Sequence, residues 1–171
     1  SEYDRTLLGG SLPRYLYGGN LHMGYGSFDL SASFQGVGKQ LSQKTTAMVE
    51  PFLAQYIEVP QLIIGKYWSY YNTDEQNLKA KYPRVSNVGN TNNYTFSNYW
   101  LFNGAYFRLK SVTLSYNVNE RVCQRLRVSS VQIYASGTDL FSIDHYPKGW
   151  DPEASSYWVM KSFIFGISLG L

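Results

Sequence analysis

Large apolar side chains occupy every second position near the end of this chain. The members of this series are Phe163, Phe165, Ile167, Leu169 and Leu171. The residues between them are small or polar except for Ile164. Because successive side chains of a β-strand point to opposite faces, the pattern predicts a strand with one wholly apolar face. Strands of outer-membrane barrels have this character, with the apolar face toward lipid.

The same alternation recurs in four earlier segments of the chain. We therefore expect an all-β chain of about five antiparallel strands, near residues 14–25, 28–37, 104–118, 128–141 and 158–171. The apolar positions of these strands would form a single face against lipid. The residues that we expect to face lipid are Leu21, Met23, Leu30, Leu114, Ile133, Ile167 and Leu169.

The third expected strand interrupts its own alternation. Its apolar residues before Lys110 are out of phase with those after Ser111. A β-bulge near this pair would restore the phase, and bulges are common at the rims of barrels. Arg108 and Lys110 would then lie near the outer rim or face the interior, where charge is tolerated.

The links between the expected strands alternate between short and long. Turns are expected near residues 26–27 and 119–126, and longer loops near 38–103 and 142–157. Barrels of this kind have short turns on the periplasmic side and long loops outside the cell. The spacing of Val122 and Leu126 further predicts a helical turn within the second short link. We interpret Cys123, in that link, as a structural residue.

Aromatic residues supply much of the apolar content of the 171-residue chain. It has 16 Tyr, 9 Phe and 4 Trp, whereas charged residues make up only 16%. Such rings suit the two aromatic girdles of a membrane barrel. We expect Tyr25, Phe28 and Tyr116 at the periplasmic girdle, and Phe141 and Trp158 at the outer one. A Tyr-rich β-sandwich that binds sugars has a similar composition and stays open at this point.

Simple features of the sequence disfavour a helical membrane span, an internal disulfide and nucleic-acid binding. No run approaches the roughly 18 consecutive apolar residues of a transmembrane helix. The first residues do not form a signal peptide, so we expect the chain to begin inside a longer precursor. A single cysteine provides no internal disulfide. The formal net charge of +3 is too small to favour nucleic acid as a partner.

Candidate metal and catalytic residues are few. His22 falls on a polar row and is expected to be a hydrated wall residue rather than a metal ligand. Asp151 and Glu153 suggest calcium, but the proline between them favours a structural turn. The neighbouring Asp144 and His145 are a weak sign of a hydrolase, because general acid-base chemistry needs a defined partner. We therefore expect no catalytic residue, no metal site and no cofactor.

The long segment near 38–103 is the best candidate for contact with a ligand or partner. It holds an aromatic cluster, and one further ring lies in the second long loop. The contact candidates are Tyr67, Trp68, Tyr70, Tyr71 and Trp150. Such rings can stack on a sugar or pack against another protein, and both interpretations stay open.

Several motifs occur in an order that resembles the C-terminal region of SusC-like TonB-dependent outer-membrane transporters (the SusC/RagA family). They are Phe-Asp-Leu at 28–30, Phe-Gln-Gly at 34–36, Gly-Ala-Tyr-Phe-Arg-Leu-Lys at 104–110, Tyr-Ala-Ser-Gly-Thr-Asp-Leu-Phe at 134–141 and Gly-Trp-Asp-Pro-Glu at 149–153. Asp139 stands where the family usually has Asn, and Leu171 where it often has an aromatic residue. The motifs cover nearly the whole chain.

The resemblance implies a barrel of about 22 strands with an internal plug, of which residues 1–171 would be a C-terminal part without the plug. It implies a non-enzymatic transporter that imports oligosaccharides or peptides. Expected partners are the rest of the same transporter, a SusD-like surface lipoprotein, the TonB-ExbB-ExbD complex and outer-membrane lipid. The expected location is the outer membrane of a Gram-negative bacterium of the Bacteroidota. A carbohydrate-binding surface β-sandwich is the main alternative, and an outer-membrane hydrolase is a weaker one.

Overall fold

The structure is a computed structural model that describes residues 5–53, 58–87, 91–154 and 159–170. The chain divides into two compact units. The first, here called the strand unit, comprises Gly10–Leu41 and Asn103–Leu171. The second, here called the insert unit, comprises Ser1–Gly9 and Ser42–Phe102. Most of the expected long loop near 38–103 is thus a compact unit of its own.

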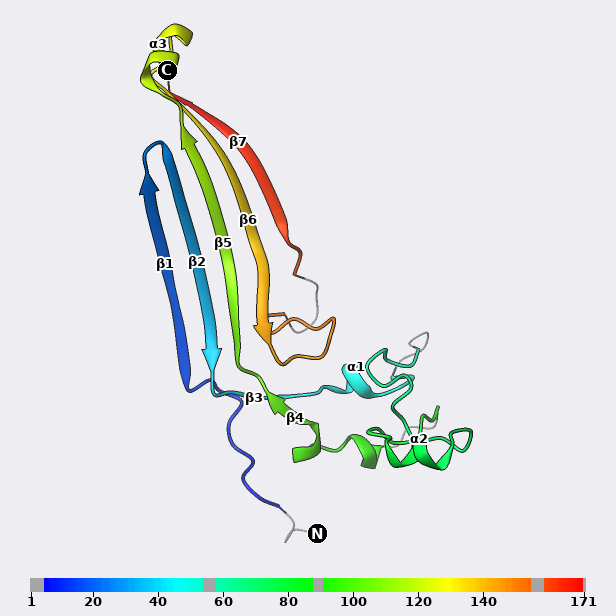
Figure 1. Cartoon of the computed structure of the whole chain (residues 1–171). Helices are drawn as coiled ribbons and strands as arrows, with labels where there is room; N and C mark the ends of the chain where they lie inside the picture. Colours follow the sequence, from blue (N-terminus) through cyan, green and yellow to red (C-terminus); the bar gives the residue numbers. More distant parts are fainter. Residues whose placement is uncertain (1–4, 54–57, 88–90, 155–158, 171) are drawn as a thin grey trace. The chain divides into compact units, whose positions relative to one another are not determined.

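The strand unit is a single antiparallel sheet of five strands (Figure 1). Its strands are β1 (Tyr15–Tyr25), β2 (Phe28–Gly38), β5 (Tyr106–Asn117), β6 (Ser130–Asp144) and β7 (Ser162–Gly170). They pair in the order β1-β2-β5-β6-β7. The expectation of an all-β chain with about five antiparallel strands is therefore confirmed.

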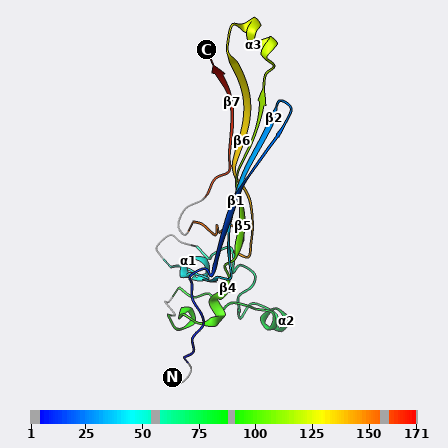
Figure 2. The same cartoon turned by 90° about the vertical axis from the view of Figure 1, so that its left-hand side faces the viewer.

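Both short links of the sheet lie at one end of the strands (Figures 1 and 2). The β1–β2 turn contains Gly26 at a φ of 60°, a left-handed conformation that glycine adopts without strain. The link between β5 and β6 contains the helix α3 (Glu120–Leu126), as the spacing predicted. Asn119 caps its start by accepting a hydrogen bond from the Arg121 amide at 2.9 Å. Cys123 is the buried residue of α3.

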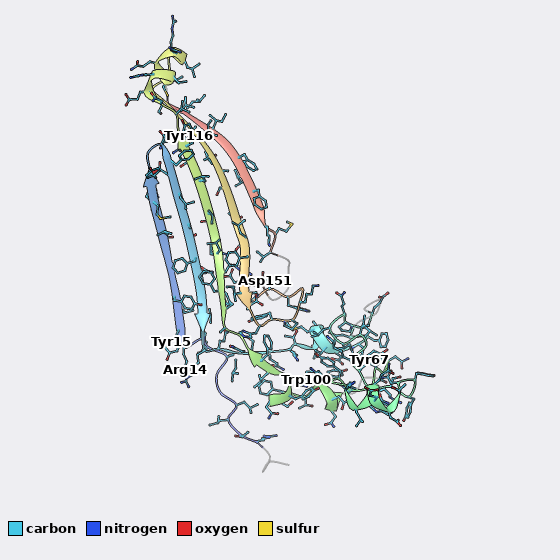
Figure 3. All side chains as sticks on the ribbon, in the orientation of Figure 1. Arg14, Tyr15, Tyr67, Trp100, Tyr116 and Asp151 are labelled. Atoms are coloured by element: carbon cyan, nitrogen blue, oxygen red, sulfur yellow. The ribbon has the colours of Figure 1, made fainter. Side chains whose placement is uncertain are left out.

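The register of the sheet puts most apolar positions of the five strands on one face, and Leu16, Val37 and Ile164 fall on the other. Leu30 lies opposite Leu114, which lies opposite Ala135, which in turn lies opposite Phe165. The seven residues expected to face lipid all belong to this apolar face, and Leu21, for example, is 49% exposed. The side chains that alternate with them form the opposite, polar face. Figure 3 shows side chains projecting from both faces of the strands.

The predicted bulge is present at Lys110. On one side of β5, Ser111 pairs with Ser33 and Leu109 with Phe34, so Lys110 is an extra residue in this ladder. The ladder with β6 is shifted at the same level, where Asp139 has a φ of 50°. The bulge restores the apolar face, because Leu109 and Phe34 now lie on the same side as Leu114.

Two strand boundaries differ from the expected ranges by three residues or more, and the other described boundaries agree to within two. β6 continues to Asp144 instead of ending near 141, because its alternation resumes after the shift and adds Ile143 to the apolar face. β7 begins at Ser162 rather than near 158, since regular alternation starts only at Phe163. Trp158, expected at the outer girdle, and Leu171 lie outside the described residues.

The aromatic rings of the sheet concentrate at its two ends. Near α3, the rings of Phe28 and Tyr116 lie 4.9 Å apart. Toward the other end, Phe107 lies 5.7 Å from Phe34 and 6.2 Å from Phe141. Figure 3 shows Tyr116 near α3 and Tyr15 at the opposite end. Between these two groups the apolar face carries aliphatic residues or glycine on β1, β2, β5 and β6, whereas Phe163 and Phe165 of β7 lie at intermediate levels. Aromatic residues near both ends of the strands suit the two interfaces of a membrane barrel.

The insert unit has short elements built around one tryptophan. They are α1 (Thr46–Val49), α2 (Asp74–Leu78) and the 3-10 helices η2 (Thr91–Tyr94) and η3 (Asn98–Trp100). The strands β3 (Leu41–Gln43) and β4 (Leu101–Asn103) pair where the chain enters and leaves this unit. Trp100 is 3% exposed and stacks with Tyr82 and Tyr94. In the described part of the chain, no helix has the length and apolar character needed to cross a membrane.

Candidate functional site on the polar face

Hydroxyl and amide side chains form cross-strand pairs on the polar face of the sheet. The Ser33 and Ser111 hydroxyl groups lie 2.7 Å apart, and those of Thr113 and Ser136 lie 2.8 Å apart. Nearer to α3, the Asn117 amide donates to Asp29 at 2.7 Å. These pairs link β2, β5 and β6 side by side. A face of this kind suits contact with water, whereas the opposite face suits contact with hydrocarbon.

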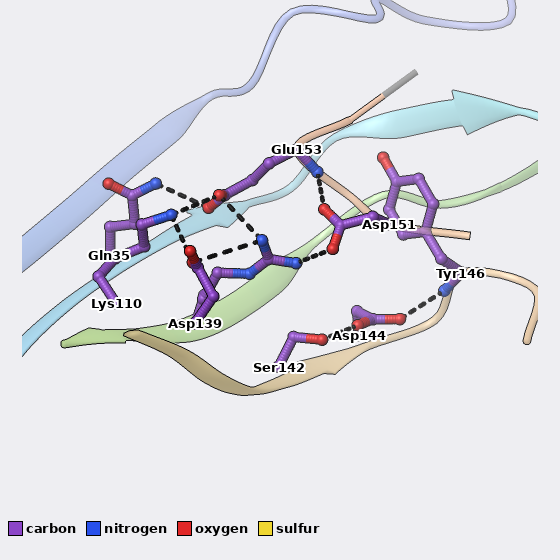
Figure 4. A network of polar contacts seen from close by, with 9 residues as sticks. Gln35, Lys110, Asp139, Ser142, Asp144, Tyr146, Asp151 and Glu153 are labelled. Atoms are coloured by element: carbon purple, nitrogen blue, oxygen red, sulfur yellow. Dashed lines mark hydrogen bonds and ion pairs between the residues drawn. The ribbon is translucent and has the colours of Figure 1, made fainter. Parts of the chain in front are cut away.

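A buried arginine organises the far end of this polar face. Arg108, the third residue of β5, is only 3% exposed. Its guanidinium donates to Asp151 at 2.5 Å and to Glu153 at 3.1 Å, and lies 3.7 Å from Asp139 (Figure 4). Asp151 and Glu153 belong to the loop between β6 and β7. The arginine therefore joins a strand to a loop more than 40 residues further along the chain.

The bulged lysine completes the charged cluster, which we define as Arg108, Lys110, Asp139, Asp151 and Glu153. Lys110 Nζ lies 2.6 Å from Asp139 and 2.9 Å from Glu153. The Gln35 amide of β2 donates to the other Glu153 oxygen at 2.7 Å. Within the loop, the Glu153 amide donates to Asp151 at 2.8 Å. Three strands and one loop thus meet in a single polar network (Figure 4).

The electrostatics of the cluster favour charged carboxylates. Two cations and three carboxylates give it a formal charge of −1 (2 − 3 = −1). Burial by itself raises the pKa of Glu153, but the hydrogen bonds from Gln35 and Lys110 and the nearby charges of Arg108 and Lys110 outweigh it. The pKa of Glu153 consequently lies below its usual value. Glu153 is therefore ionised at neutral pH and accepts bonds from three side chains.

The sequence had placed Arg108 and Lys110 near the rim or inward, and both lie on the polar side in the cluster. It had not paired them with Asp151 and Glu153, which were interpreted as a turn. The overlooked signal was complementary spacing. Two cations stand two residues apart in β5, and two acids stand two residues apart in the loop. In chemical terms, this arrangement fixes the β6–β7 loop against the polar face.

Asp144, the acid considered for catalysis, is held by local hydrogen bonds. Asp144 accepts hydrogen bonds from the Ser142 hydroxyl at 2.6 Å and the Tyr146 amide at 3.0 Å. His145 is exposed beside it, and His22 is exposed on the polar row of β1. Among the residues that the structure describes, no three His, Cys, Asp or Glu side chains are placed to hold a metal ion.

Three of the aromatic candidates form an exposed patch in the insert unit. The Trp68 and Tyr70 rings meet edge to face with centroids 4.6 Å apart. The Arg84 guanidinium lies 5.7 Å from the Tyr70 centroid, within cation-π range. Tyr70 is 76% exposed and Tyr71 is 99% exposed. Tyr67 is half-buried and forms a bridge with Tyr82, so it supports the patch rather than extending it.

Local hydrogen bonds hold the turn that carries this patch. The Asn77 side chain accepts from the Ser69 amide at 3.1 Å and donates to the Ser69 carbonyl at 2.9 Å. It also accepts from Asn72 at 3.1 Å. Thr73 and Gln76 form a capping box at the start of α2. Because these bonds fix the turn, the backbone that carries the rings has little conformational entropy left to lose on binding.

Trp150, the fifth candidate, belongs to the strand unit and is half-buried in the β6–β7 loop. Its amide donates to the Pro147 carbonyl at 2.9 Å. Sequence reasoning overlooked a different feature of the insert unit, a cavity of about 460 Å³. Rings and amides line it, among them Tyr99, Trp100, Phe96, Asn92 and Asn93. The apolar run Tyr-Trp-Leu-Phe at 99–102, with three aromatic residues, was the available signal.

Comparisons with known proteins agree with this geometry. No family model matches the chain. The chain is 29% identical over 156 residues to TonB-dependent receptor P3 of Formosa agariphila, and the match covers 91% of this chain. It spans only 14% of the length of that receptor. The match therefore concerns one part of a much longer protein.

Solved structures of the RagAB peptide importer share the fold. Its open-open state matches with a TM-score of 0.69 at 19% identity, covering 94% of this chain and 17% of that chain. Its closed-closed state matches with the same TM-score at 20% identity, covering 95% of this chain and 18% of that chain. The proteins found are a receptor and an importer, in agreement with the expectation of a non-enzymatic role. The resemblance to SusC-like TonB-dependent transporters is thereby confirmed.

Proposed function

We propose that this chain is a wall segment of a TonB-dependent transporter that imports nutrients across an outer membrane. The observation that carries the proposal is the division of five antiparallel strands into one continuous apolar face and one polar face. A soluble β-sandwich would cover the apolar face with a second sheet. Instead, Leu114 and Ile167 on this face are about half or more exposed within the strand unit. Lipid is the natural solvent for such a surface.

In this proposal the apolar face contacts outer-membrane lipid through the seven residues named for it, from Leu21 to Leu169. The polar face lines the interior, and the end with the β1–β2 turn and α3 faces the periplasm. The insert unit and the β6–β7 loop then lie on the external side of the wall. The host is a Gram-negative bacterium, and the Formosa relative supports a member of the Bacteroidota.

The proposed partners follow from the same reasoning. Other strands must complete the barrel, because open sheet edges do not persist in hydrocarbon. The plug, a SusD-like surface lipoprotein and the TonB-ExbB-ExbD complex complete the transporter. The cargo is an oligosaccharide or a peptide, and the similarity to the RagAB peptide importer gives peptides some preference. The segment needs no metal or cofactor for this role.

The patch of Trp68, Tyr70 and Tyr71 in the insert unit is one proposed contact surface for cargo or the lipoprotein, and Trp150 in the strand unit is a separate contact candidate. Amphipathic rings on a hydrogen-bonded turn suit both kinds of partner. We expect Tyr70→Ala/Tyr71→Ala to weaken cargo binding or co-purification of the lipoprotein at least fivefold. Leu78→Ala is a matched control, because Leu78 is also strongly exposed nearby in sequence. Equal effects of the patch variant and the control would remove the patch from the proposal.

The function is tested with the full-length protein of which this chain is a part. We expect it to require detergent for extraction and to migrate as a heat-modifiable barrel. Uptake of labelled oligopeptides and oligosaccharides should be lost in cells without TonB. A full-length protein that dissolves without detergent, or uptake that is the same with and without TonB, would contradict the proposal.

A further inference from the structure

The helix α3 leaves an unusual set of side chains uncovered. Val122 and Leu126, four residues apart, are 45% and 62% exposed, while Cys123 between them is buried against the sheet. Arg121 and Arg125 form the neighbouring stripe at the same spacing. An apolar stripe beside a basic stripe is the pattern of a helix that lies at a membrane surface.

The arginines of this link have no acidic partner in the described part of the chain. Arg121, Arg125 and Arg127 are exposed, and none of the ion pairs described involves them. Glu120 is the one acid between residues 119 and 129, which leaves the link with a formal charge of +2 (3 − 1 = 2). Three free guanidinium groups favour an anionic ligand, and phosphate in particular.

A furrow on the apolar face begins near the end of the sheet that carries α3. Ala135 has a short side chain between Leu114 and Phe165 on the two neighbouring strands. The furrow has a volume of about 530 Å³, and the rings and aliphatic chains of Tyr116, Ile133 and Ile167 extend it toward α3. From Ser130 to Ala135 a strand advances roughly 17 Å. One leaflet of a hydrocarbon core is about 15 Å deep, so the furrow lies at the depth of an acyl chain.

We propose that α3 and this furrow form a binding site for an anionic glycerophospholipid. Arg121, Arg125 and Arg127 contact its phosphate and headgroup, Val122 and Leu126 enter the upper acyl region, and one acyl chain lies over Ala135. The site rests on the proposed function, because it needs the apolar face to be in a bilayer. Charge complementarity selects an anionic lipid over a zwitterionic one. An arginine close to an anionic headgroup contributes about fivefold in affinity.

The site is tested on the full-length transporter in neutral detergent, by native mass spectrometry during titration with dioleoylphosphatidylglycerol or dioleoylphosphatidylcholine. Wild-type protein should bind phosphatidylglycerol at least tenfold more tightly. Arg121→Gln/Arg125→Gln should weaken phosphatidylglycerol binding roughly 25-fold, the product of two fivefold terms, and leave phosphatidylcholine binding unchanged. Arg14→Gln/Lys148→Gln is the matched control, because it removes two exposed cations far from α3 and should change neither affinity by more than twofold.

A second variant tests the furrow without a change in charge. Ala135→Leu fills the space between Leu114 and Phe165, and we expect it to weaken binding of both lipids at least threefold. No preference of the wild-type protein for phosphatidylglycerol, or no effect of the double arginine variant, would overturn the site. No effect of Ala135→Leu would overturn the acyl-chain contact. Heat-modifiable migration of each purified variant and TonB-dependent uptake by cells that produce it are measured in parallel, so failure of the lipid site is distinguished from failure of the transport function.

Discussion

Replacement of Arg108 by glutamine should release the β6–β7 loop from the wall. The guanidinium is buried and donates to Asp151 and Glu153 from that loop. Glutamine is polar, but it is shorter, carries no charge and has a single donor nitrogen to reach both loop carboxylates. Lys110 alone would then face three carboxylates, and Asp151 would lose its only described cation.

The size of the effect follows from the burial of the partners. Loss of one member of a buried ion pair costs about 3–5 kcal/mol, because the remaining charge is left uncompensated. The Asp151 and Glu153 side chains retain 22% and 17% exposure, so water recovers part of this cost. We therefore take the lower end, about 3 kcal/mol. At 1.36 kcal/mol per tenfold, the opening equilibrium of the loop should shift by roughly 150-fold.

Hydrogen exchange of the loop amides measures this opening directly. The Trp150 and Glu153 amides are hydrogen-bonded within the loop, to Pro147 and Asp151. Their exchange in the full-length protein should accelerate about 100-fold or more in Arg108→Gln. Lys79→Gln is the control, because its ion pair with Glu75 is largely exposed and such pairs contribute roughly 0.3–0.5 kcal/mol. In Lys79→Gln, the exchange of the Trp150 and Glu153 amides should change by less than threefold.

One result would refute the reasoning. If the loop amides of Arg108→Gln exchange within threefold of wild type, the loop is held by something other than the charged cluster. If instead amides throughout β5 and β6 accelerate equally with the loop, the arginine stabilises the sheet as a whole rather than the attachment of the loop.

Three further outcomes follow from the same geometry. Because the pKa of Glu153 is lowered by folding, its stabilising effect is complete above the ordinary carboxyl pKa of about 4.3 and is lost as pH falls through the lower folded value. The hydrogen exchange of the loop amides, corrected for its intrinsic rate, should be constant from pH 8 to 5 and rise below about pH 4. Glu153→Gln should flatten that rise. Leu21→Arg on the apolar face should cost about 2–4 kcal/mol in a bilayer unfolding titration, whereas Asn20→Arg, next to it on the polar face, should cost far less; equal costs would show that the facing is wrong. Asp139→Val and Asp139→Asn both remove the ion pairs of Asp139 with Lys110 and Arg108, but the valine variant should have a free energy of unfolding about 1–2 kcal/mol lower than the asparagine variant in the same titration, because a β-branched residue is strained at a φ of 50° that asparagine tolerates.

Alternation was sufficient to predict the strands and the facing of their residues. A period of two is a local property, so Leu30, Leu114 and Ile133 could be assigned to one face without knowledge of the partners. The interruption before Ser111 likewise located the bulge, because only an extra residue can restore the phase. The spacing of Val122 and Leu126, which indicated the helical turn, was also a local signal.

Contacts between distant segments could not be predicted in this way. The pairing of Arg108 with Asp151 joins residues 43 positions apart, and no periodicity connects them. The insert unit was expected to be a long loop with an aromatic cluster at 67–71. Its centre is instead Trp100, whose role depends on stacking with Tyr82 and Tyr94 from separate segments. Such packing depends on tertiary structure that short sequence windows do not contain.

The extra residue in β5 also has a consequence for how such chains are recognised. A search for uninterrupted alternation would divide this strand at Lys110 into residues 106–109 and 111–117. Neither piece reaches the roughly 9–11 residues that a bilayer crossing requires, so the crossing would be missed and every later strand would be assigned the wrong direction. Natural variants one residue shorter at this point would keep the same residues on the apolar and polar faces and the same strand directions. A gap here in a comparison of two such chains therefore marks a change in strand shape and not a change of topology.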